Sequence, residues 1–429
     1  MRDDIIIDCF AGGGGASVGI EMALGRPVDI AVNHDPMAIR MHETNHPQTL
    51  HLTEDIFKVN LTKYVKGQHV SLMWASPDCT SHSKAKGGQP RCKGLRILPW
   101  AVFKHAKAVT PDVIIMENVE EIQQWGPLDD EGHPIKELAG MDYKKFINAM
   151  VSIGYDFESR ELVAACYGAP TTRKRWYAIF RRDGRPIVWP EPTLDKDHWV
   201  PVSTCLDFSD LGSSIFSRKK PLAISTQRRI AFGIKKFILD DPDPFYVSSQ
   251  RMMPFLIQYH SETSEMVRGQ KVTEALKTID TSNRYGLVSC LLEECGEAPR
   301  ENGVAAFLTS YYSSSTGQNM REPLRTITTD DRFGLVTVKF QKYQITDIMM
   351  RMLKPEELKE AQGFPKDYII DRYADWSPVS HKEQVARIGN SVVPIMAEAL
   401  VKANCPYLKD GERVPLARLD YSQPQARFA

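Results

Sequence analysis

The chain has 429 residues, of which 42% are hydrophobic and 25% are charged, as in a globular protein of more than one domain. It contains no run of about eighteen apolar residues, so we expect no membrane-spanning helix. Its eight cysteines form no CxxC pair, which argues against a zinc site and a secreted disulfide framework. The 54 basic and 54 acidic residues cancel, so a nucleic-acid-binding surface would have to be local.

The first predicted elements are a strand over residues 5–10, a glycine-rich turn over 11–17 and a helix over 18–24. Glycines let a backbone approach a ligand closely, and the first turn of a helix offers free N–H groups. This order is typical of a nucleotide-type cofactor site, although an ordinary tight turn has the same composition. No Lys-Ser or Lys-Thr follows the glycines, which disfavours a phosphate-binding P-loop.

A second strand is predicted over 28–35, with Asn33 and Asp35 at its carboxyl end, where a ribose-binding group belongs. Turn chemistry before Pro36 explains the same residues equally well. Asp55 follows at the end of a plausible third strand.

The fourth predicted strand, over 70–74, should end before Pro77, because proline cannot donate to a sheet ladder. Cys79 then lies just past a carboxyl end, beside the small, polar and cationic segment 81–88. Lysines favour the thiolate form of a cysteine, so Cys79 is a candidate nucleophile. The alternative is a small hydrophobic side chain at the end of a strand.

A fifth apolar run, over 111–119, ends at Glu117, and a carboxylate there is costly unless it is paired or functional. The alternative is a glutamate that simply reaches solvent. A helix over 143–153 and strands over 155–165 and 176–180 should follow. Arg173 and Arg175, before the last strand, are either surface cations or donors to an anion or a base.

The composition changes after Pro186 to short β-type runs, Ser, Thr and basic pairs. Residues 276–288 recur as 324–336, and 255–259 are echoed by 307–311, which predicts two similar β units suited to recognition. The alternative is a structural duplication without a binding role. Helices are then predicted over 346–353, 354–362 and 395–403, and the tail after Pro406 is polar. The expected domains are 1–186, 187–340 for recognition, 341–405 returning to the first domain, and a tail over 406–429.

In this order the segments resemble the DNA (cytosine-5)-methyltransferases over residues 5–180 and 345–402. Residues 8–15 are similar to the family's S-adenosylmethionine turn, 76–79 to its Pro-Cys nucleophile motif, and 117–119 to its Glu-Asn-Val. Arg173 and Arg175 fall where its Gln-x-Arg-x-Arg lies. Residues 351–365 are similar to its late helix motif, and 389–394 to its last cofactor motif.

The resemblance implies an α/β fold: a Rossmann-like S-adenosylmethionine-dependent methyltransferase domain with a smaller, mostly β target-recognition domain. It implies S-adenosylmethionine as methyl donor and no metal. The implied catalytic residues are Cys79, Glu117, Arg173 and Arg175. The implied cofactor-binding residues are Phe10, Ala11, Gly12, Gly14, Asn33, Asp35, Asp55, Pro77, Asn390, Ser391 and Val392. The expected DNA-binding residues are Ser81, Lys84, Lys86, Arg284 and Arg332.

Three departures from the family pattern concern the site. Asp78 and Thr80 flank Cys79 where the family usually has Pro and Gln. Asn33 stands where the second strand usually supplies a glutamate to the ribose, and Thr171 replaces the Gln of Gln-x-Arg-x-Arg. None of them removes a group that bonds covalently to the substrate.

The expected partner is double-stranded DNA, with a restriction endonuclease acting on the same site as a possible associate. We expect a monomer in the cytoplasm with the nucleoid. Two rival functions are a Rossmann-type dehydrogenase, which needs an acidic ribose residue and gives Cys79 no role, and a non-catalytic DNA-binding module, which makes no covalent adduct.

Overall fold

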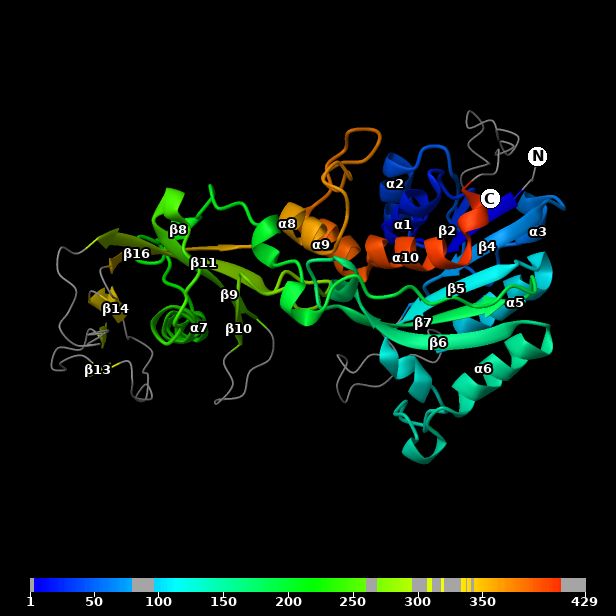
Figure 1. Cartoon of the computed structure of the whole chain (residues 1–429), viewed down its shortest axis with the longest axis horizontal. Helices are drawn as coiled ribbons and strands as arrows, with labels where there is room; N and C mark the ends of the chain where they lie inside the picture. The colour runs from blue at the N-terminus through cyan, green and yellow to red at the C-terminus, as the bar shows by residue number, and fades with distance from the viewer. Residues whose placement is uncertain are drawn as a thin grey trace. The chain divides into compact units, whose positions relative to one another are not determined.

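The computed structural model describes residues 4–78, 96–259, 268–294, 307–310, 318–319, 333–336, 338–340 and 343–409. The chain forms two compact units (Figure 1). The first comprises Met1–Val200, Leu276–Ser282 and Leu358–Ala429, and the second comprises Pro201–Ala275 and Asn283–Glu357. The domain boundaries expected at residues 186 and 340 lie before those of the compact units.

The first unit is built on a seven-stranded sheet in the order β3-β2-β1-β4-β5-β7-β6. Its strands are β1 (Asp4–Cys9), β2 (Ile30–Val32), β3 (Leu50–Leu52), β4 (His69–Ala75), β5 (Val113–Asn118), β6 (Asp156–Val163) and β7 (Lys174–Arg181). Five neighbouring strands are parallel, and β7 is antiparallel to both β5 and β6. The predicted α/β class is therefore confirmed.

Helices cover both faces of this sheet, which explains why its central strands are apolar throughout. On one face, Ile5 and Ile7 of β1 pack with α3 (Leu61–Val65), α5 (Pro99–Val109) and α6 (Met141–Ser152). On the other face, Ile6 packs with α1 (Gly15–Leu24) and α10 (Pro394–Asn404) (Figure 1). Helices α2 (Pro36–Asn45) and α9 (His381–Asn390) complete the part of this unit that concerns the site.

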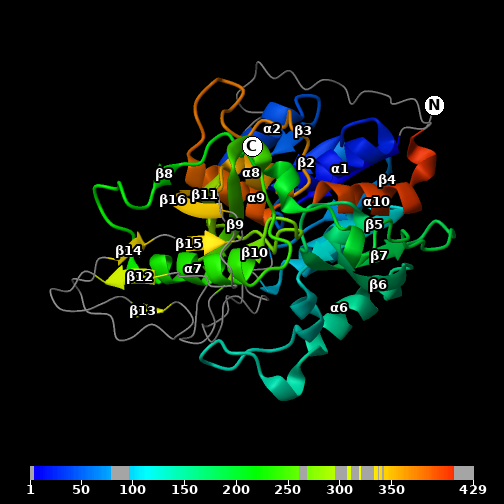
Figure 2. The same cartoon turned by 60° about the vertical axis from the view of Figure 1, so that its left-hand side comes forward.

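The second unit has a sheet in the order β10-β9-β11-β16-β15, with β8 paired to β16. These strands are β8 (Ser213–Ser214), β9 (Met252–Gln258), β10 (Gly269–Lys271), β11 (Tyr285–Glu294), β15 (Val338–Phe340) and β16 (Tyr343–Met352). Helix α7 (Ile224–Ile234) packs against it through Ile230, Ile234 and Phe255 (Figure 2). A separate small sheet has the order β13-β12-β14, from β12 (Phe307–Ser310), β13 (Gln318–Asn319) and β14 (Phe333–Val336).

The predicted helix over 346–353 is wrong, because these residues form most of β16. Ile348 and Met350 are buried and alternate with more exposed neighbours, as in a strand. A shift in the β11–β16 register leaves Thr346 without an opposite residue. The extra residue interrupts the alternation that would have revealed a strand in the sequence.

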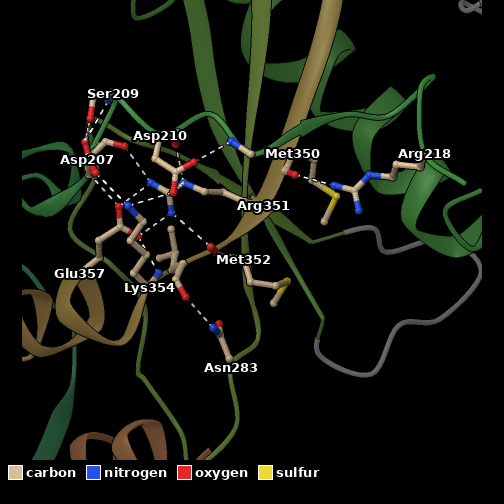
Figure 3. A network of polar contacts seen from close by, with 12 residues as sticks. Asp207, Ser209, Asp210, Arg218, Asn283, Met350, Arg351, Met352, Lys354 and Glu357 are labelled. Carbon is tan, nitrogen blue, oxygen red and sulfur yellow. Dashed lines mark hydrogen bonds and ion pairs between the residues drawn. The ribbon is translucent and has the colours of Figure 1, made fainter. Parts of the chain in front are cut away.

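A buried ion-pair network ties the end of β16 to the start of α8 (Pro355–Ala361) (Figure 3). Arg351 donates to both carboxylate oxygens of Glu357, at 2.7 and 2.8 Å, and to the Asp207 carbonyl at 2.8 Å. The N–H groups of Asp207 and Lys354 also donate to Glu357. These hydrogen bonds satisfy the Glu357 carboxylate, which is only 3% exposed. Residues 351–357 therefore have a structural role in the second unit.

Candidate active site

The carboxyl ends of β1 and β4 lie side by side at the centre of the sheet. Cys9 and Ala75 are register partners, and the Ser76 N–H donates to the Cys9 carbonyl (3.3 Å). The order of strands reverses between β1 and β4, and such a reversal is where open α/β sheets bind ligands. The glycine turn and the segment leading to Cys79 therefore begin next to each other. Cys79 itself lies outside the described residues.

The glycine turn has an unusual backbone. Phe10, Gly12 and Gly14 have φ values of 64°, 54° and 91°, and the first is uncommon for a residue with a side chain. The Ala11 N–H donates to the Val32 carbonyl (3.1 Å), and the Gly14 N–H donates to the Ala11 carbonyl (3.0 Å). A Cβ on Gly12 would meet no described atom outside its neighbours closer than 3.8 Å, so there is room beside it for a ligand.

Gly14 and Gly15 are required for a different reason, the close packing of the carboxyl-terminal segment. A Cβ on Gly14 would lie 2.2 Å from Tyr368 Oη, and one on Gly15 would lie 2.2 Å from the Val392 carbonyl oxygen. The Tyr368 hydroxyl donates to the Gly13 carbonyl (2.6 Å). Tyr368 was not identified from the sequence, because a loop tyrosine has no periodic pattern.

Asp35 is occupied by structural contacts. One oxygen accepts from the N–H groups of Met37 and Ala38 and so caps α2, and the other lies 2.5 Å from Arg387. Partial burial opposes ionisation, but the hydrogen bond and charge of Arg387 hold the pKa of Asp35 below its ordinary value. Asn33 Oδ1 accepts from the Asp35 N–H (2.9 Å). The alternative of turn chemistry thus describes the contacts of both residues.

Asp55 is exposed and accepts from the Phe57 N–H (2.9 Å), the contact of a local turn.

Glu117 and Arg175 lie together at the same carboxyl edge. Arg175 Nε is 3.2 Å from Glu117 Oε1, and both side chains are largely buried, at 14% and 11% exposure. The next residue, Asn118, donates to the Pro77 carbonyl (3.0 Å) and so ties the end of β5 to the segment that follows β4. The structure therefore brings a carboxyl and a guanidinium to the segment that precedes Cys79.

Arg173 points to a different group. It is 5% exposed and donates to the Ile279 carbonyl (3.2 Å). Thr171 forms a parallel bridge with Leu276, and the Thr172 N–H donates to the Leu276 carbonyl (2.7 Å). Arg173 therefore anchors Leu276–Ser282 within the first unit.

Residues 389–394, which resemble the family's last cofactor motif, pack against the glycine turn. The Ser391 hydroxyl donates to the Arg387 carbonyl (2.8 Å), and Gln362 donates to the Ser391 carbonyl (3.0 Å). Ser391 and Val392 are both 5% exposed, whereas Asn390 is exposed. Because Val392 abuts Gly15, this motif holds the glycine turn in place.

The expected DNA-binding residues are described only in part. Arg284, in the second unit, donates to the Tyr259 carbonyl (3.2 Å), a contact that braces the backbone within this unit. Ser81, Lys84, Lys86 and Arg332 lie outside the described residues.

Within the described ranges, no helix is long and apolar enough to cross a membrane. Among the same residues, no group of three or more His, Cys, Asp or Glu side chains is arranged to hold a metal ion.

Comparisons with known proteins agree on one family. The model of the C-5 cytosine-specific DNA methylase family matches residues 5–404. Type II methyltransferase M1.HphI of Haemophilus parahaemolyticus is 27% identical over 192 residues, which are 44% of this chain and 48% of the relative. M.SacI of Streptomyces achromogenes is 25% identical over 44% of this chain and 50% of its own, so the chain spans about half the length of these relatives. M.DdeI of Desulfomicrobium norvegicum is 25% identical over 92% of this chain and 87% of its own.

Solved structures share the fold. A putative DNA modification methyltransferase encoded within a prophage of E. coli aligns with a TM-score of 0.53 at 19% identity, over 95% of this chain and 99% of its own. S. pombe Dnmt2 methyltransferase aligns with a TM-score of 0.50 at 14% identity, over 94% and 98%. Because the family model spans nearly the whole chain, the chain belongs to the C-5 cytosine-specific DNA methylase family.

Proposed function

We propose that the chain methylates carbon 5 of cytosine in double-stranded DNA, with S-adenosylmethionine as the methyl donor. The observation that carries the proposal is the Glu117–Arg175 pair, 3.2 Å apart and tied through Asn118 to the segment before Cys79. A carboxyl and a guanidinium side by side match the ring nitrogen and carbonyl oxygen on one edge of cytosine.

Cys79 is the proposed nucleophile. Carbon 5 of cytosine is a poor nucleophile, and addition of the Cys79 thiolate to carbon 6 turns the ring into an enamine that reacts at carbon 5. This addition moves negative charge onto ring nitrogen 3 and the carbonyl oxygen. A protonated Glu117 would donate to nitrogen 3, and Arg175 would hold the carbonyl oxygen. Arg173 would act indirectly, through the segment it anchors.

The residues around the glycine turn fit S-adenosylmethionine, which supplies a methyl group on sulfonium when bound. Phe10, Ala11 and Gly12 form the start of the turn, where a Cβ on Gly12 would come no closer than 3.8 Å to a described atom outside its neighbours, and the Asn33 amide lies at the end of the neighbouring strand, suited to a hydroxyl. Pro77, Asn390, Ser391 and Val392 would complete the pocket, whereas Asp35 would shape it through α2 and Arg387. Asp55, which is exposed and bonded within its own turn, has the weakest support.

The substrate must be duplex DNA with its target cytosine turned out of the stack, because the reacting carbon is unreachable inside a helix. Ser81, Lys84 and Lys86 are proposed to bind the backbone near that base. A restriction endonuclease that cuts the same site is the proposed associate, without direct contact, and the chain is proposed to act as a monomer in the cytoplasm.

The test is base-resolution sequencing of 5-methylcytosine in DNA from cells that lack this modification and express the chain. We expect one short sequence to be methylated throughout the genome. Absence of 5-methylcytosine, with folded protein present, would refute the proposed activity. A methylated genome would also exclude the dehydrogenase and the non-catalytic module.

Gly12→Ala should weaken S-adenosylmethionine binding by at least about tenfold, because its Cβ would enter the space left for the ligand. Gly67→Ala is the matched control, since Gly67 has φ 78° and a Cβ there would meet nothing within 4 Å. Both variants should lose roughly 1–3 kcal/mol of stability through backbone strain. Calorimetry that shows equal affinity for both variants would contradict the assignment of the turn. Gly14→Val is a poorer test, because its side chain would collide with Tyr368.

Sequence choice is proposed to lie in residues 190–340. If Arg332 reads a base edge, Arg332→Ala should cost about 1–3 kcal/mol at one position of the target and relax choice there. Arg284→Ala should keep the target sequence, because Arg284 braces the Tyr259 carbonyl. Methylation of a randomised DNA pool measures both effects. Recognition lies elsewhere if neither variant, nor exchange of residues 190–340 with those of a relative, changes the preferred sequence.

A further inference from the structure

A chain of buried hydrogen bonds begins directly before the glycine turn. Asp8 is the second-last residue of β1, and its Oδ2 atom lies 2.7 Å from Ser17 Oγ on α1. Ser17 Oγ lies 2.9 Å from His42 Nε2 on α2, and His42 Nδ1 lies 2.8 Å from His51 Nε2 on β3. Asp8, Ser17 and His42 are all 0% exposed, and His51, at the far end, is half-buried. Four elements around the turn are thus linked by polar side chains inside an apolar core.

The four side chains of this hydrogen-bonded series can all be uncharged at the same time. Ser17 Oγ donates to an ionised Asp8 Oδ2, but a protonated Asp8 donates to Ser17 in its place; the Ser17 hydroxyl then donates to His42 Nε2, and His42 Nδ1–H donates to His51 Nε2. His51 also hydrogen-bonds the backbone of Thr49. In this arrangement each side chain is neutral and each link has one donor and one acceptor.

The surroundings favour the uncharged arrangement. Burial raises the pKa of Asp8 to about 7 against the opposing effect of its hydrogen bonds to Ser17, and burial lowers the pKa of His51 to about 4. Burial also holds the pKa of His42 well below its ordinary value, with His46 and His51 adding to the effect. Asp8 Oδ1 has no hydrogen-bond partner among the described residues, and an ionised carboxylate would leave that oxygen unsatisfied.

Other titratable groups lie around the hydrogen-bonded series from Asp8 to His51. Cys9 and Tyr368 both have a raised pKa, to which the charge of an ionised Asp8 contributes after burial. The His46 ring lies 4.6 Å from that of His42, and His46 Nδ1 is 3.1 Å from Glu21. Cys9 and Tyr368 can only add negative charge, and His46 has the Glu21 carboxylate as its partner.

We propose that Asp8, Ser17, His42 and His51 are positioning residues that hold the glycine turn for cofactor binding, and that they do so only while Asp8 carries its proton. The inference rests on the proposed function, because it takes S-adenosylmethionine as the ligand of this turn. When Asp8 ionises, Ser17 must donate to the carboxylate and His42 must reverse its two hydrogen bonds. The hydrogen-bonded series then contains a buried anion at the base of the glycine turn. As a result, the backbone conformation of the turn that binds S-adenosylmethionine becomes less populated.

The experiment measures S-adenosylmethionine affinity of the full chain by calorimetry from about pH 6 to about pH 9. Asp8→Ala should bind more weakly than wild type at every pH. Asp8→Asn should restore binding, since its amide donates to Ser17 as the protonated acid does. The dissociation constant of wild type, divided by that of Asp8→Asn, should rise about tenfold per pH unit above about pH 7. This ratio cancels the titration of the ligand's own amino group.

Asp156→Asn is the control for the substitution itself, because Asp156 is exposed on β6, and it should follow the wild-type profile. A ratio that stays constant with pH, or an Asp8→Asn variant that binds as weakly as Asp8→Ala, would overturn the inference while leaving the cofactor assignment intact. If wild type binds no S-adenosylmethionine at any pH, the proposed function and this inference fail together.

Thermal unfolding without ligand gives a second readout. The pKa of Asp8 is about 7 when folded and 3.8 as its ordinary value. A raised pKa in the folded state means that the contribution of this acid to stability falls as pH rises between these values and is constant above them. Wild type should therefore lose stability relative to Asp8→Asn from about pH 4 to about pH 7. Parallel profiles would show that folded Asp8 is ionised and would contradict the proposal.

Discussion

Cys79→Ala should abolish DNA methylation, with a fall in turnover on the order of 10⁴-fold or more, as expected when a covalent nucleophile is removed. Cys79 is chosen because the residues after β4, which include Pro77, leave the sheet beside the glycine turn. The order of strands reverses at this point. Binding of S-adenosylmethionine should change little, since the glycine turn and its partners remain. Transfer of a labelled methyl group to DNA measures the effect.

The control for Cys79 is Cys166→Ala, which removes a half-buried thiol from the same unit. This variant should methylate DNA at the wild-type rate. Methylation by Cys79→Ala at more than a few per cent of wild type would remove Cys79 from the mechanism. Equal losses in both variants would point to a folding defect in place of a chemical one.

Glu117→Gln should lower the rate of methyl transfer by about 10²–10⁴-fold, because an amide cannot share a proton with ring nitrogen 3. Arg175→Ala should lower it by about 10²–10³-fold, the usual effect of losing one electrostatic clamp. Both losses should appear in the rate constant of methyl transfer measured under single-turnover conditions, with S-adenosylmethionine affinity largely retained. We expect these losses because Arg175 Nε lies 3.2 Å from Glu117 Oε1 and both side chains are largely buried.

Glu161→Gln is the matched control for Glu117→Gln. Glu161 on β6 pairs with Lys174 on β7 at 2.8 Å, and this pair is well exposed. An exposed pair contributes about 0–1 kcal/mol to stability, so its loss should leave the rate unchanged. A Glu117→Gln rate within threefold of the Glu161→Gln rate would show that Glu117 takes no part in the chemistry.

The sheet of the first unit was largely predictable because its central strands β1, β4 and β5 are buried on both faces. Uninterrupted apolar runs such as 5–7 and 113–116 have no other common structural explanation when turn residues bound them. Because the carboxyl ends of parallel strands meet at one edge of the sheet, the polar residues that follow these runs are expected at that edge. Glu117 and Arg175 are adjacent there for that reason.

Contacts between residues distant in sequence were not predictable. Asp35 is paired by Arg387, Arg173 by the Ile279 carbonyl, and Gly14 is crowded by Tyr368. Each partner lies more than 100 residues away, and no local pattern specifies it. Sequence position alone therefore could not show which parts of the chain contact Asp35, Arg173 and Gly14.

The internal repeat was predictable in more detail, because the paired strands preserve its register. Phe255 is opposite Val288 in β9 and β11, and Phe307 is opposite Val336 in β12 and β14. The strands of the two copies are thus paired at equivalent positions of the repeat. Their unequal surroundings were not predictable: Leu276–Ser282 of the first copy belongs to the first unit, while the described part of the second copy belongs to the second.

The most direct test of the account is covalent trapping on duplex DNA that carries 5-fluorocytosine at the target site, with S-adenosylmethionine present. Fluorine at carbon 5 cannot leave as a proton does, so the enzyme should remain bonded to carbon 6 after methyl transfer. We predict a stable protein–DNA adduct whose mass-spectrometric peptide map places the modified base on Cys79. No adduct on DNA that the chain otherwise methylates, or an adduct on any other residue, would contradict the account.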